Sequence, residues 1–229
     1  MSKHKKQTNK LPEENIFLKS LTLTEDFRNL KKGYKIKFDS PITLLVGENG
    51  TGKTTVLDLI RSYYDVKTRS YMKSNTGKKI RVYGSKLETE EVFYFDFHSD
   101  DMKYSGYFGE DMGSQVSAIW ASSGEGAVTQ FFSTGITKKE SSLILLDELG
   151  RGGSIRTHYL YSIFLDKLAT KNRNQIIAAT HSPIIISELA EHPYCSLYSM
   201  EHNRYMKLED FLKSQKDISK SRFLIKKKN

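Results

Sequence analysis

A glycine-rich segment at residues 47–54 constrains the fold and the chemistry of this chain more than any other part of its sequence. The segment reads Gly47-Glu48-Asn49-Gly50-Thr51-Gly52-Lys53-Thr54. Two glycines at this spacing before a lysine and a hydroxyl residue predict a phosphate-binding loop. The glycines let successive backbone N–H groups turn toward phosphate oxygens, and the N-terminus of a following helix adds its positive dipole.

The residues of the loop predict ATP and Mg²⁺ as ligands. Lys53 is expected to reach the β- and γ-phosphates, and the hydroxyl of Thr54 is expected to ligate Mg²⁺. The other positions are expected to line the nucleotide; they are Gly47, Glu48, Asn49, Gly50, Thr51, Gly52 and Thr55.

The pattern of apolar residues on both sides of the loop predicts an α/β fold. An apolar run at 42–46 precedes the loop, and apolar side chains at helical spacing follow it over 54–63. Strands that alternate with helices favour a mostly parallel sheet. Further strands are predicted at 16–24, 34–38, 79–83, 91–97, 143–146 and 175–180, and further helices at about 157–170 and 183–190.

Two carboxylates, Asp147 and Glu148, follow the apolar strand predicted at 143–146. Taken alone they are equally consistent with simple solvation of a strand end. Together with the phosphate loop they predict a nucleotide site in which Asp147 holds Mg²⁺ through water. Glu148 is then the candidate base that polarises the attacking water.

A histidine follows the strand predicted at 175–180. His181 should therefore lie at the carboxyl end of that strand, the edge at which α/β sheets bind ligands. A single histidine after a strand is often incidental, but its position after the Asp-Glu pair favours contact with the γ-phosphate. Lys53, Glu148 and His181 are thus the predicted catalytic residues.

The segment Ala121-Ser122-Ser123-Gly124-Glu125 precedes the Asp-Glu strand and resembles the signature motif of ABC ATPases. The resemblance implies that the hydroxyl of Ser122 and the N–H of Gly124 contact the γ-phosphate held by a second subunit. It therefore implies a homodimer that closes around two ATP molecules.

The resemblance covers roughly residues 15–207 and is nearest to ABC-class ATPases of the RecF, SMC and overcoming-lysogenization-defect type. Thr180-His181-Ser182-Pro183 is similar to these proteins, and residues 147–154 also resemble a stretch of the mismatch-repair ATPase MutS. The implied fold is a P-loop NTPase of ABC type, with a mostly parallel sheet flanked by helices. An N-terminal antiparallel β part and a small helical insertion belong to it.

Two positions depart from this family or leave a choice open. No glutamine stands at 92–98, where the family has its glutamine loop, so Asp96 or His98 would have to take that role. Arg28 could approach the nucleotide or could form an exposed ion pair.

Composition narrows the choice of partners. The net charge of +9, concentrated in the two ends, indicates a polyanion such as DNA, although basic ends also serve only to keep a chain soluble. One cysteine excludes an intrachain disulfide framework. No run approaches the ~20 apolar residues of a membrane helix, so we expect a cytoplasmic protein without membrane insertion. The expected organisation is a basic segment at 1–14, an ATPase domain at 15–210 and a basic segment at 211–229.

Three functions remain in competition on the sequence alone. The first is a DNA-associated or defence-related ABC-type ATPase that acts on a partner effector protein. The second is the ATP-binding subunit of a transporter, which is disfavoured because Leu149 stands where transporters usually have proline. The third is a nucleotide-gated binding module with little turnover.

Overall fold

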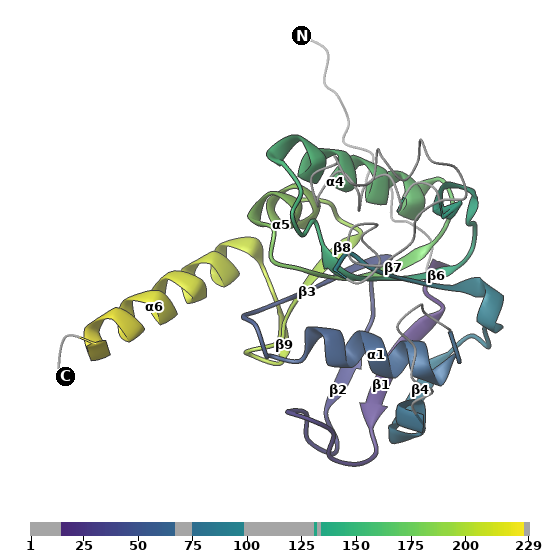
Figure 1. Ribbon diagram of the computed structural model, residues 1–229, viewed down its shortest axis with the longest axis horizontal. Coiled ribbons are helices and arrows are strands. Elements are labelled where there is room, and N and C mark those ends of the chain that lie inside the picture. The colour runs from purple at the N-terminus through teal and green to yellow at the C-terminus, as the bar shows by residue number, and fades with distance from the viewer. Residues whose placement is uncertain (1–14, 67–74, 99–130, 132–133, 227–229) are drawn as a thin grey trace, which may run out of the picture.

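The computed structural model describes residues 15–66, 75–98, 131 and 134–226 (Figure 1). Its strands are β1 (Leu18–Leu23), β2 (Lys35–Lys37), β3 (Ile42–Val46), β4 (Ile80–Gly84), β5 (Val92–Asp96), β6 (Leu143–Leu149), β7 (Gln175–Thr180), β8 (Cys195–Ser199) and β9 (Arg204–Met206). Its α-helices are α1 (Lys53–Tyr63), α4 (Ile155–Thr170), α5 (Pro183–Ala190) and α6 (Leu208–Lys226). Short 3-10 helices lie at η2 (Asn75–Lys79), η3 (Thr89–Glu91) and η4 (Ile136–Lys138).

The described strands form two sheets. The larger has the order β5-β6-β7-β3-β8-β9, with parallel pairing throughout except at the edge strand β9, which is antiparallel to β8. The smaller is antiparallel, with the order β2-β1-β4. The predicted α/β class, the mostly parallel sheet and the antiparallel N-terminal part are confirmed. The predicted helical insertion and the signature residues Ser122 and Gly124 lie outside the described residues.

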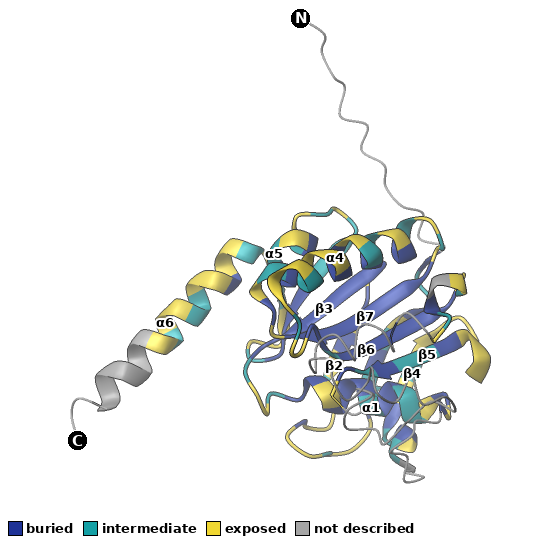
Figure 2. Ribbon diagram, turned by 45° about the horizontal axis from the view of Figure 1, so that its top comes forward, coloured by how far each residue is buried: buried dark blue, intermediate teal, exposed yellow. Residues whose placement is uncertain are grey.

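Both faces of the larger sheet are covered, which explains why its central strands β3 and β7 are buried at every position. In β3, Leu45 packs with α1 and the smaller sheet, whereas Leu44 and Val46 pack with α4 and α5 on the opposite face. Figure 1 shows α1 below the sheet and α4 and α5 above it. Because helices cover both faces, β3, β6 and β7 are buried, as their dark blue colour in Figure 2 shows.

A buried glutamine joins the two sheets. The side chain of Gln175, at the start of β7, accepts a hydrogen bond from the N–H of Leu18 at 2.7 Å and donates one to the carbonyl of Leu18 at 2.8 Å. Its amide thus pairs with both the N–H and the carbonyl of Leu18, which lies opposite Gly84 in the β1–β4 register. This contact holds β1 of the smaller sheet against the start of β7, a central strand of the larger sheet.

The structure also contains a helix that the sequence analysis did not predict. Residues 211–229 were expected to be a basic segment, but Leu208–Lys226 form α6, which extends away from the two sheets (Figures 1 and 2). Phe211 is buried against the body of the protein, whereas Leu212 is exposed. None of the described helices is both long enough and apolar enough to cross a bilayer.

Candidate functional site

The phosphate loop lies between β3 and α1, at the carboxyl edge of the larger sheet. Gly50 and Gly52 have positive φ angles of 80° and 105°, which residues with a Cβ rarely adopt. Gly52 is the N-cap of α1, and a Cβ there would lie 3.1 Å from Leu30. The two glycines thus turn the chain from strand into helix, and the N-terminus of the helix opens toward the loop.

Lys53 is buried and is bonded to its own loop. Its Nζ donates hydrogen bonds to the carbonyls of Gly47 and Glu48, both at 2.9 Å. Burial lowers the pKa of Lys53, and the carboxylates of Glu148 and Asp147 oppose that shift. The ammonium group is therefore poorly solvated and lies near acidic groups. Phosphate oxygens could replace its two carbonyl partners and would form stronger, charge-assisted hydrogen bonds.

Asp147, in β6, supplies the buried carboxylate of the site and contacts the first turn of α1. Its Oδ1 accepts hydrogen bonds from Thr54 Oγ1 at 3.2 Å and from the Glu148 N–H at 3.0 Å. Tyr94 OH lies 3.4 Å from Oδ2, and burial raises the pKa of Tyr94, so that its hydroxyl remains a donor. Asp96 lies directly beside Asp147 in the β5–β6 ladder.

This environment stores unfavourable electrostatic energy that a cation would relieve. Burial, and after it the neighbouring Asp96 carboxylate, raises the pKa of Asp147 to about 7. Among the described residues no three His, Cys, Asp or Glu side chains form a ready-made metal site. A hydroxyl and one or two carboxylates are nevertheless what Mg²⁺ uses when phosphates complete its coordination. The residues present therefore fit this ion.

The raised pKa of Asp147 leads to a pH-dependent stability prediction. The folded protein holds a proton on Asp147 up to about pH 7, whereas the unfolded chain loses it near pH 4, so this group destabilises the fold progressively as pH rises between these values. We expect Asp147→Asn, in nucleotide-free and Mg²⁺-free protein, to raise the free energy of unfolding at pH 8 by on the order of a few kcal/mol. The gain should shrink by pH 5, as measured by urea unfolding.

Asp26 provides the matched control for this measurement. Its pKa is lowered by hydrogen bonds with the Lys32 N–H and the Lys31 side chain, so Asp26→Asn should bring no gain at pH 8. An Asp147→Asn gain that is absent at pH 8, or equal at pH 5 and pH 8, would show that Asp147 is ionised at little cost.

Glu148 has a strained backbone at the end of β6. Its φ is 55°, a left-handed conformation that costs a residue with a Cβ roughly 1 kcal/mol or more. The β6–β7 register shifts between Leu146 and Leu149, so Glu148 lies at an irregularity of the strand. Its Oε2 accepts a hydrogen bond from Arg151 Nη1 at 3.1 Å, and the side chain remains partly exposed. Glu148 is thus not part of the regular β6–β7 ladder, and its side chain lines a cavity over the phosphate loop.

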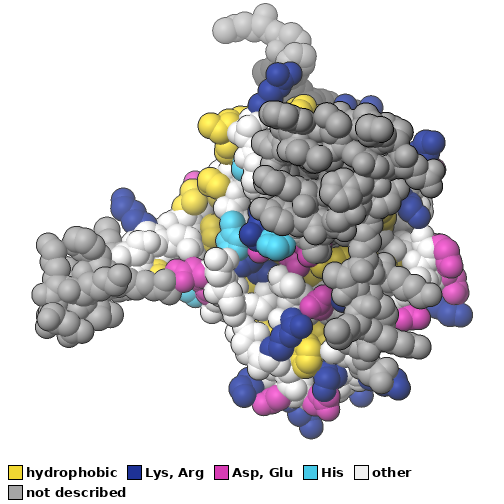
Figure 3. Space-filling model, viewed as in Figure 1, with side chains coloured by type: hydrophobic (Ala, Val, Ile, Leu, Met, Phe, Trp, Pro, Cys, Tyr) yellow, Lys and Arg dark blue, Asp and Glu magenta, His cyan; other side chains and the backbone are white. Residues whose placement is uncertain are grey.

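His181 follows β7 and lies close to the other charged groups of the site. Burial lowers its pKa, the positive charge of Lys53 lowers it further, and Glu148 opposes the shift. The imidazole is therefore held in its neutral form at neutral pH. On the face shown in Figure 3, histidine, basic and acidic side chains gather in the middle of the surface.

A cavity of about 330 Å³ lies over the phosphate loop, with walls from the β1–β2 connection, the start of α1 and the end of β6. Arg28 Nη1 lies 3.3 Å from both Thr55 Oγ1 and Asp58 Oδ2, so the arginine both lines the cavity and forms an ion pair. Asn29 Nδ2 donates to the Gly50 carbonyl at 2.6 Å. The cavity is lined by Arg28, Asn29, Asn49, Gly50, Gly52, Lys53, Thr54, Thr55 and Glu148.

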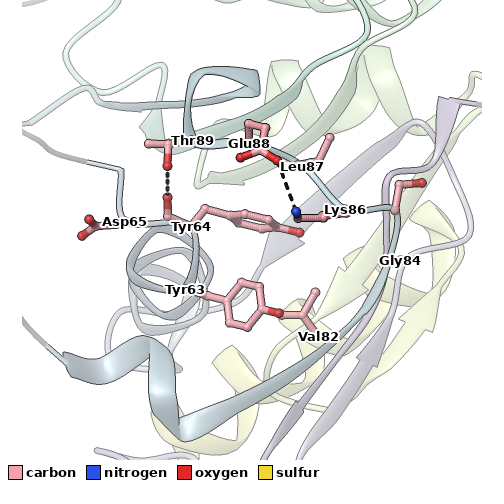
Figure 4. A pocket seen from close by; sticks show the side chains of 10 residues that line it. Tyr63, Tyr64, Asp65, Val82, Gly84, Lys86, Leu87, Glu88 and Thr89 are labelled. Atoms are coloured by element: carbon pink, nitrogen blue, oxygen red, sulfur yellow. Dashed lines mark hydrogen bonds and ion pairs between the residues drawn. The ribbon is translucent and has the colours of Figure 1, made fainter.

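A larger cavity, of about 470 Å³, lies elsewhere (Figure 4). It is lined by the end of α1, including Tyr63 and Tyr64, and by residues from Val82 to Thr89. A rise of 1.5 Å per residue along α1 places Tyr63 about 15 Å from Lys53. The larger cavity therefore lies apart from the phosphate loop.

One acidic residue that the sequence analysis did not single out contacts the phosphate loop. Glu201, just after β8, accepts a hydrogen bond from the Glu48 N–H at 3.1 Å through Oε1. Its Oε2 accepts one from Gln215 Nε2 of α6 at 2.8 Å. The loop is thus tied to the C-terminal helix through a single carboxylate.

The structure brings together the predicted residues of the loop, the Asp-Glu pair and His181. It does not describe Ser122 or Gly124. Of the two candidates for the glutamine-loop role, Asp96 adjoins Asp147, whereas His98 is exposed and donates its N–H to Asp96 at 2.8 Å. Asn29, Tyr94 and Glu201 carried no motif, so sequence reasoning missed them.

Comparison with known proteins gives both a family and a fold. A family model described as an AAA domain matches residues 24–229. The DNA replication and repair protein RecF of Rickettsia felis and that of Rickettsia prowazekii are each 49% identical to this chain over 51 residues. That segment is 22% of this chain and 14% of each relative, so the match covers only a small part of those proteins.

Two solved structures share the fold at low sequence identity. CbiO1 from Clostridium perfringens, part of the ABC transporter complex CbiONQ, has a TM-score of 0.51 and 13% identity, covering 89% of this chain and 94% of that chain. The ADP conformation of an ATP-binding cassette of an ABC transporter has a TM-score of 0.52 and 14% identity, covering 83% of this chain and 89% of that chain. The fold is therefore that of ABC ATP-binding cassettes.

Proposed function

The chain belongs to the AAA domain family, and from that membership we propose that it binds ATP with Mg²⁺ and hydrolyses it to ADP and phosphate. The convergence of Lys53, Thr54 and Glu148 on one cavity, with Asp147 bonded to Thr54, supports the proposal most strongly. A phosphate loop alone would support nucleotide binding. The additional carboxylates supply a place for the metal ion and a candidate base.

The phosphates of ATP enter the loop by replacing bonds that the loop now makes with itself. Lys53 Nζ exchanges the carbonyls of Gly47 and Glu48 for oxygens of the β- and γ-phosphates. The backbone N–H groups at the start of α1 stabilise the same negative charge. Arg28 and Asn29 lie at the rim of the cavity, where they can contact the nucleotide.

Thr54 and Asp147 would hold the metal ion. When bound, Mg²⁺ neutralises charge on the β- and γ-phosphates and so favours attack at phosphorus. The hydroxyl of Thr54 would ligate the ion and Asp147 would hold it through water; Thr54 is bonded to Asp147, and Asp96 lies beside Asp147 in the sheet. We assign the missing glutamine-loop role to Asp96 because it adjoins Asp147.

Glu148 accepts the proton of the attacking water. Arg151 donates a hydrogen bond to Oε2, and the other carboxylate oxygen, Oε1, takes the proton. His181, neutral at pH 7, then donates a hydrogen bond to the γ-phosphate.

Measuring phosphate release from ATP with and without Mg²⁺ tests the proposed hydrolysis directly, since a folded protein without Mg²⁺-dependent turnover would contradict it.

We further propose that hydrolysis takes place in a homodimer. Ser122 and Gly124 of one subunit would complete the site of the other, so neither site would be whole in a monomer. The ABC fold and the order of the motifs support this arrangement.

A transporter subunit is the second candidate function, since both solved neighbours come from ABC transporters, but Leu149 and the segment 180–183 argue against it. A binding module with little turnover is distinguished by the same phosphate-release assay.

We also propose a role in a DNA-associated or defence-related process with a partner effector protein. The net charge of +9 and the local similarity to RecF, named a DNA replication and repair protein, support the DNA part. We propose an ATPase domain at 15–210 that is flanked by basic segments at 1–14 and 211–229. Residues 211–226 of the second segment lie in α6, on which Lys213 and Lys216 are exposed.

If basic side chains of α6 bind DNA phosphates, affinity should fall steeply with salt because bound counterions are released. We expect the double variant Lys213→Gln/Lys216→Gln to weaken binding and to reduce the log–log salt slope by about 2. Lys86→Gln, an exposed lysine outside α6, is the control. Fluorescence anisotropy with duplex DNA measures both quantities. An absence of binding at low salt, with and without ATP, would leave a protein partner as the target.

A further inference from the structure

His158, near the start of α4, lies between the two loops that carry Glu148 and His181. Its Nε2 is 2.7 Å from the carbonyl oxygen of Gly150, two residues after Glu148. Its Nδ1 is 2.9 Å from the hydroxyl of Ser182, the residue after His181. One imidazole thus joins the loop of the proposed base to the turn of the proposed γ-phosphate ligand.

The chemistry of these partners determines the tautomer. A carbonyl oxygen can only accept, so His158 Nε2 carries the hydrogen that is donated to Gly150. Neutral His158 then has an unprotonated Nδ1, which accepts from the hydroxyl of Ser182. The Ser182 oxygen in turn accepts the N–H of Ile185 as the N-cap of α5. Each polar atom of this chain of bonds has a partner of the correct kind.

The loop after Glu148 packs closely against the imidazole. Gly150 has a φ of 87°, and a Cβ there would lie 3.2 Å from the ring of His158 and 2.9 Å from Ile185. A Cβ on Gly153 would also lie 3.2 Å from the ring. Two glycines therefore allow the loop to close around His158, and the Gly153 N–H shares the Gly150 carbonyl with it at 3.1 Å.

A second bond connects the same two loops. Thr180 Oγ1 donates to the Leu149 carbonyl at 2.8 Å, and the Ser182 N–H donates to Thr180 Oγ1 at 3.1 Å. Glu148 comes directly before Leu149 and Gly150, the two residues that these bonds hold, and has a left-handed φ of 55°. Such a conformation persists only where the surroundings hold it in place.

We propose that His158 is a positioning residue that holds Glu148 and His181 in a fixed relation to each other. This inference rests on the proposed ATP hydrolysis. His158 contacts neither carboxylate nor nucleotide; it acts through Gly150 on one side and Ser182 on the other. Its loss should slow the chemical step while the phosphate loop, which it does not touch, continues to bind ATP.

Three substitutions at His158 separate the two bonds. His158→Ala removes both. His158→Gln places an amide N–H near the position of Nε2 and so keeps the bond to Gly150, whereas His158→Asn places an amide oxygen near Nδ1 and keeps the bond from Ser182. His192→Ala is the matched control, because His192 is a partly buried histidine bonded to Tyr194, outside the two loops.

We expect His158→Ala to lower kcat by about tenfold or more, with the KM for ATP changed by less than about threefold. His158→Gln should recover most of kcat because it restores the hold on the Glu148 loop, and His158→Asn should recover less. His192→Ala should keep the wild-type kcat. A purely structural role predicts instead that melting temperature and kcat fall while KM rises, with no recovery in His158→Gln.

Nitrogen NMR of His158 in the nucleotide-free protein provides a readout that does not depend on turnover. We expect a protonated Nε2 and an unprotonated Nδ1 at pH 8, and a shift of the Nδ1 resonance in Ser182→Ala. A wild-type kcat in His158→Ala, or a hydrogen on Nδ1 at pH 8, would overturn the inference. A wild-type protein that lacks turnover would contradict the proposed function, and the tautomer would then decide whether the two loops are joined as described.

Discussion

Replacing Lys53 by alanine is expected to lower the affinity for ATP by about a hundredfold or more. The ammonium group is buried at the loop and has two carbonyls as its present partners, so its removal takes away two charge-assisted bonds to the phosphates. Bonds of this kind are each worth roughly 1.5–3 kcal/mol, and their loss multiplies the dissociation constant accordingly. Isothermal titration calorimetry with ATP and Mg²⁺ measures the change.

Lys31→Ala is the control for that experiment. Lys31 is an exposed lysine paired with Asp26, and its loss should leave ATP affinity unchanged. Circular dichroism establishes that Lys53→Ala is folded. A folded Lys53→Ala protein that binds ATP as tightly as the wild type would remove the phosphate-loop assignment.

Glu148→Gln is expected to slow ATP hydrolysis by about two to four orders of magnitude while ATP affinity stays within a few-fold of the wild type. Glutamine keeps the size of the side chain and can still accept the bond from Arg151, but it cannot take a proton from water. Glu140→Gln, at an exposed position, is the control. Stopped-flow detection of released phosphate gives the rate.

The same substitution should make the proposed dimer visible. If ATP joins two subunits and hydrolysis separates them, slowing hydrolysis lets the ATP-bound dimer accumulate. Light scattering should then give twice the monomer mass for Glu148→Gln in ATP and Mg²⁺. A turnover rate near that of the wild type would show that another residue acts as the base.

Much of the fold could be predicted from apolar patterning. The bounds of β3, β7 and α5 agree with prediction, since β3 and β7 are buried throughout, β3 ends before the loop glycine Gly47 and α5 begins at Pro183. The predicted strand at 143–146 was too short, since β6 continues through Asp147 and Glu148 to Leu149. The polar pair ends the apolar run, but β6 still pairs with β5 at Asp147 and with β7 at Leu149.

The elements that were missed have weak local signals. β8 and β9 are short, and β9 is held only at the sheet edge by its pairing with β8. α6 is rich in lysine, and over residues 208–219, where burial is described, only Phe211 is buried, so composition indicated a solvated end rather than a helix. Helical propensity of its Lys, Leu and Gln residues was the available signal.

The residues of the motifs could be placed in advance, whereas those that support them could not. The phosphate loop, the Asp-Glu pair and His181 carry recognisable spacing. Glu201 is 153 residues from Glu48, and His158 is 24 residues from Ser182. Contacts of this kind depend on tertiary packing, since no periodic pattern links such positions. The left-handed φ of Glu148 also belongs to this group, because an Asp-Glu-Leu sequence gives no sign of a bulge.

Mixing two inactive variants tests the central claim, ATP hydrolysis at a site shared between two subunits, most directly. Lys53→Ala removes the phosphate-loop half of the site and Ser122→Arg removes the proposed signature half, so each homodimer has two defective sites. A mixed dimer should contain one intact composite site, and phosphate release should recover to a substantial fraction of the wild-type rate. Mixed dimers that form, as shown by native mass spectrometry, but remain as inactive as either variant alone would contradict the shared site.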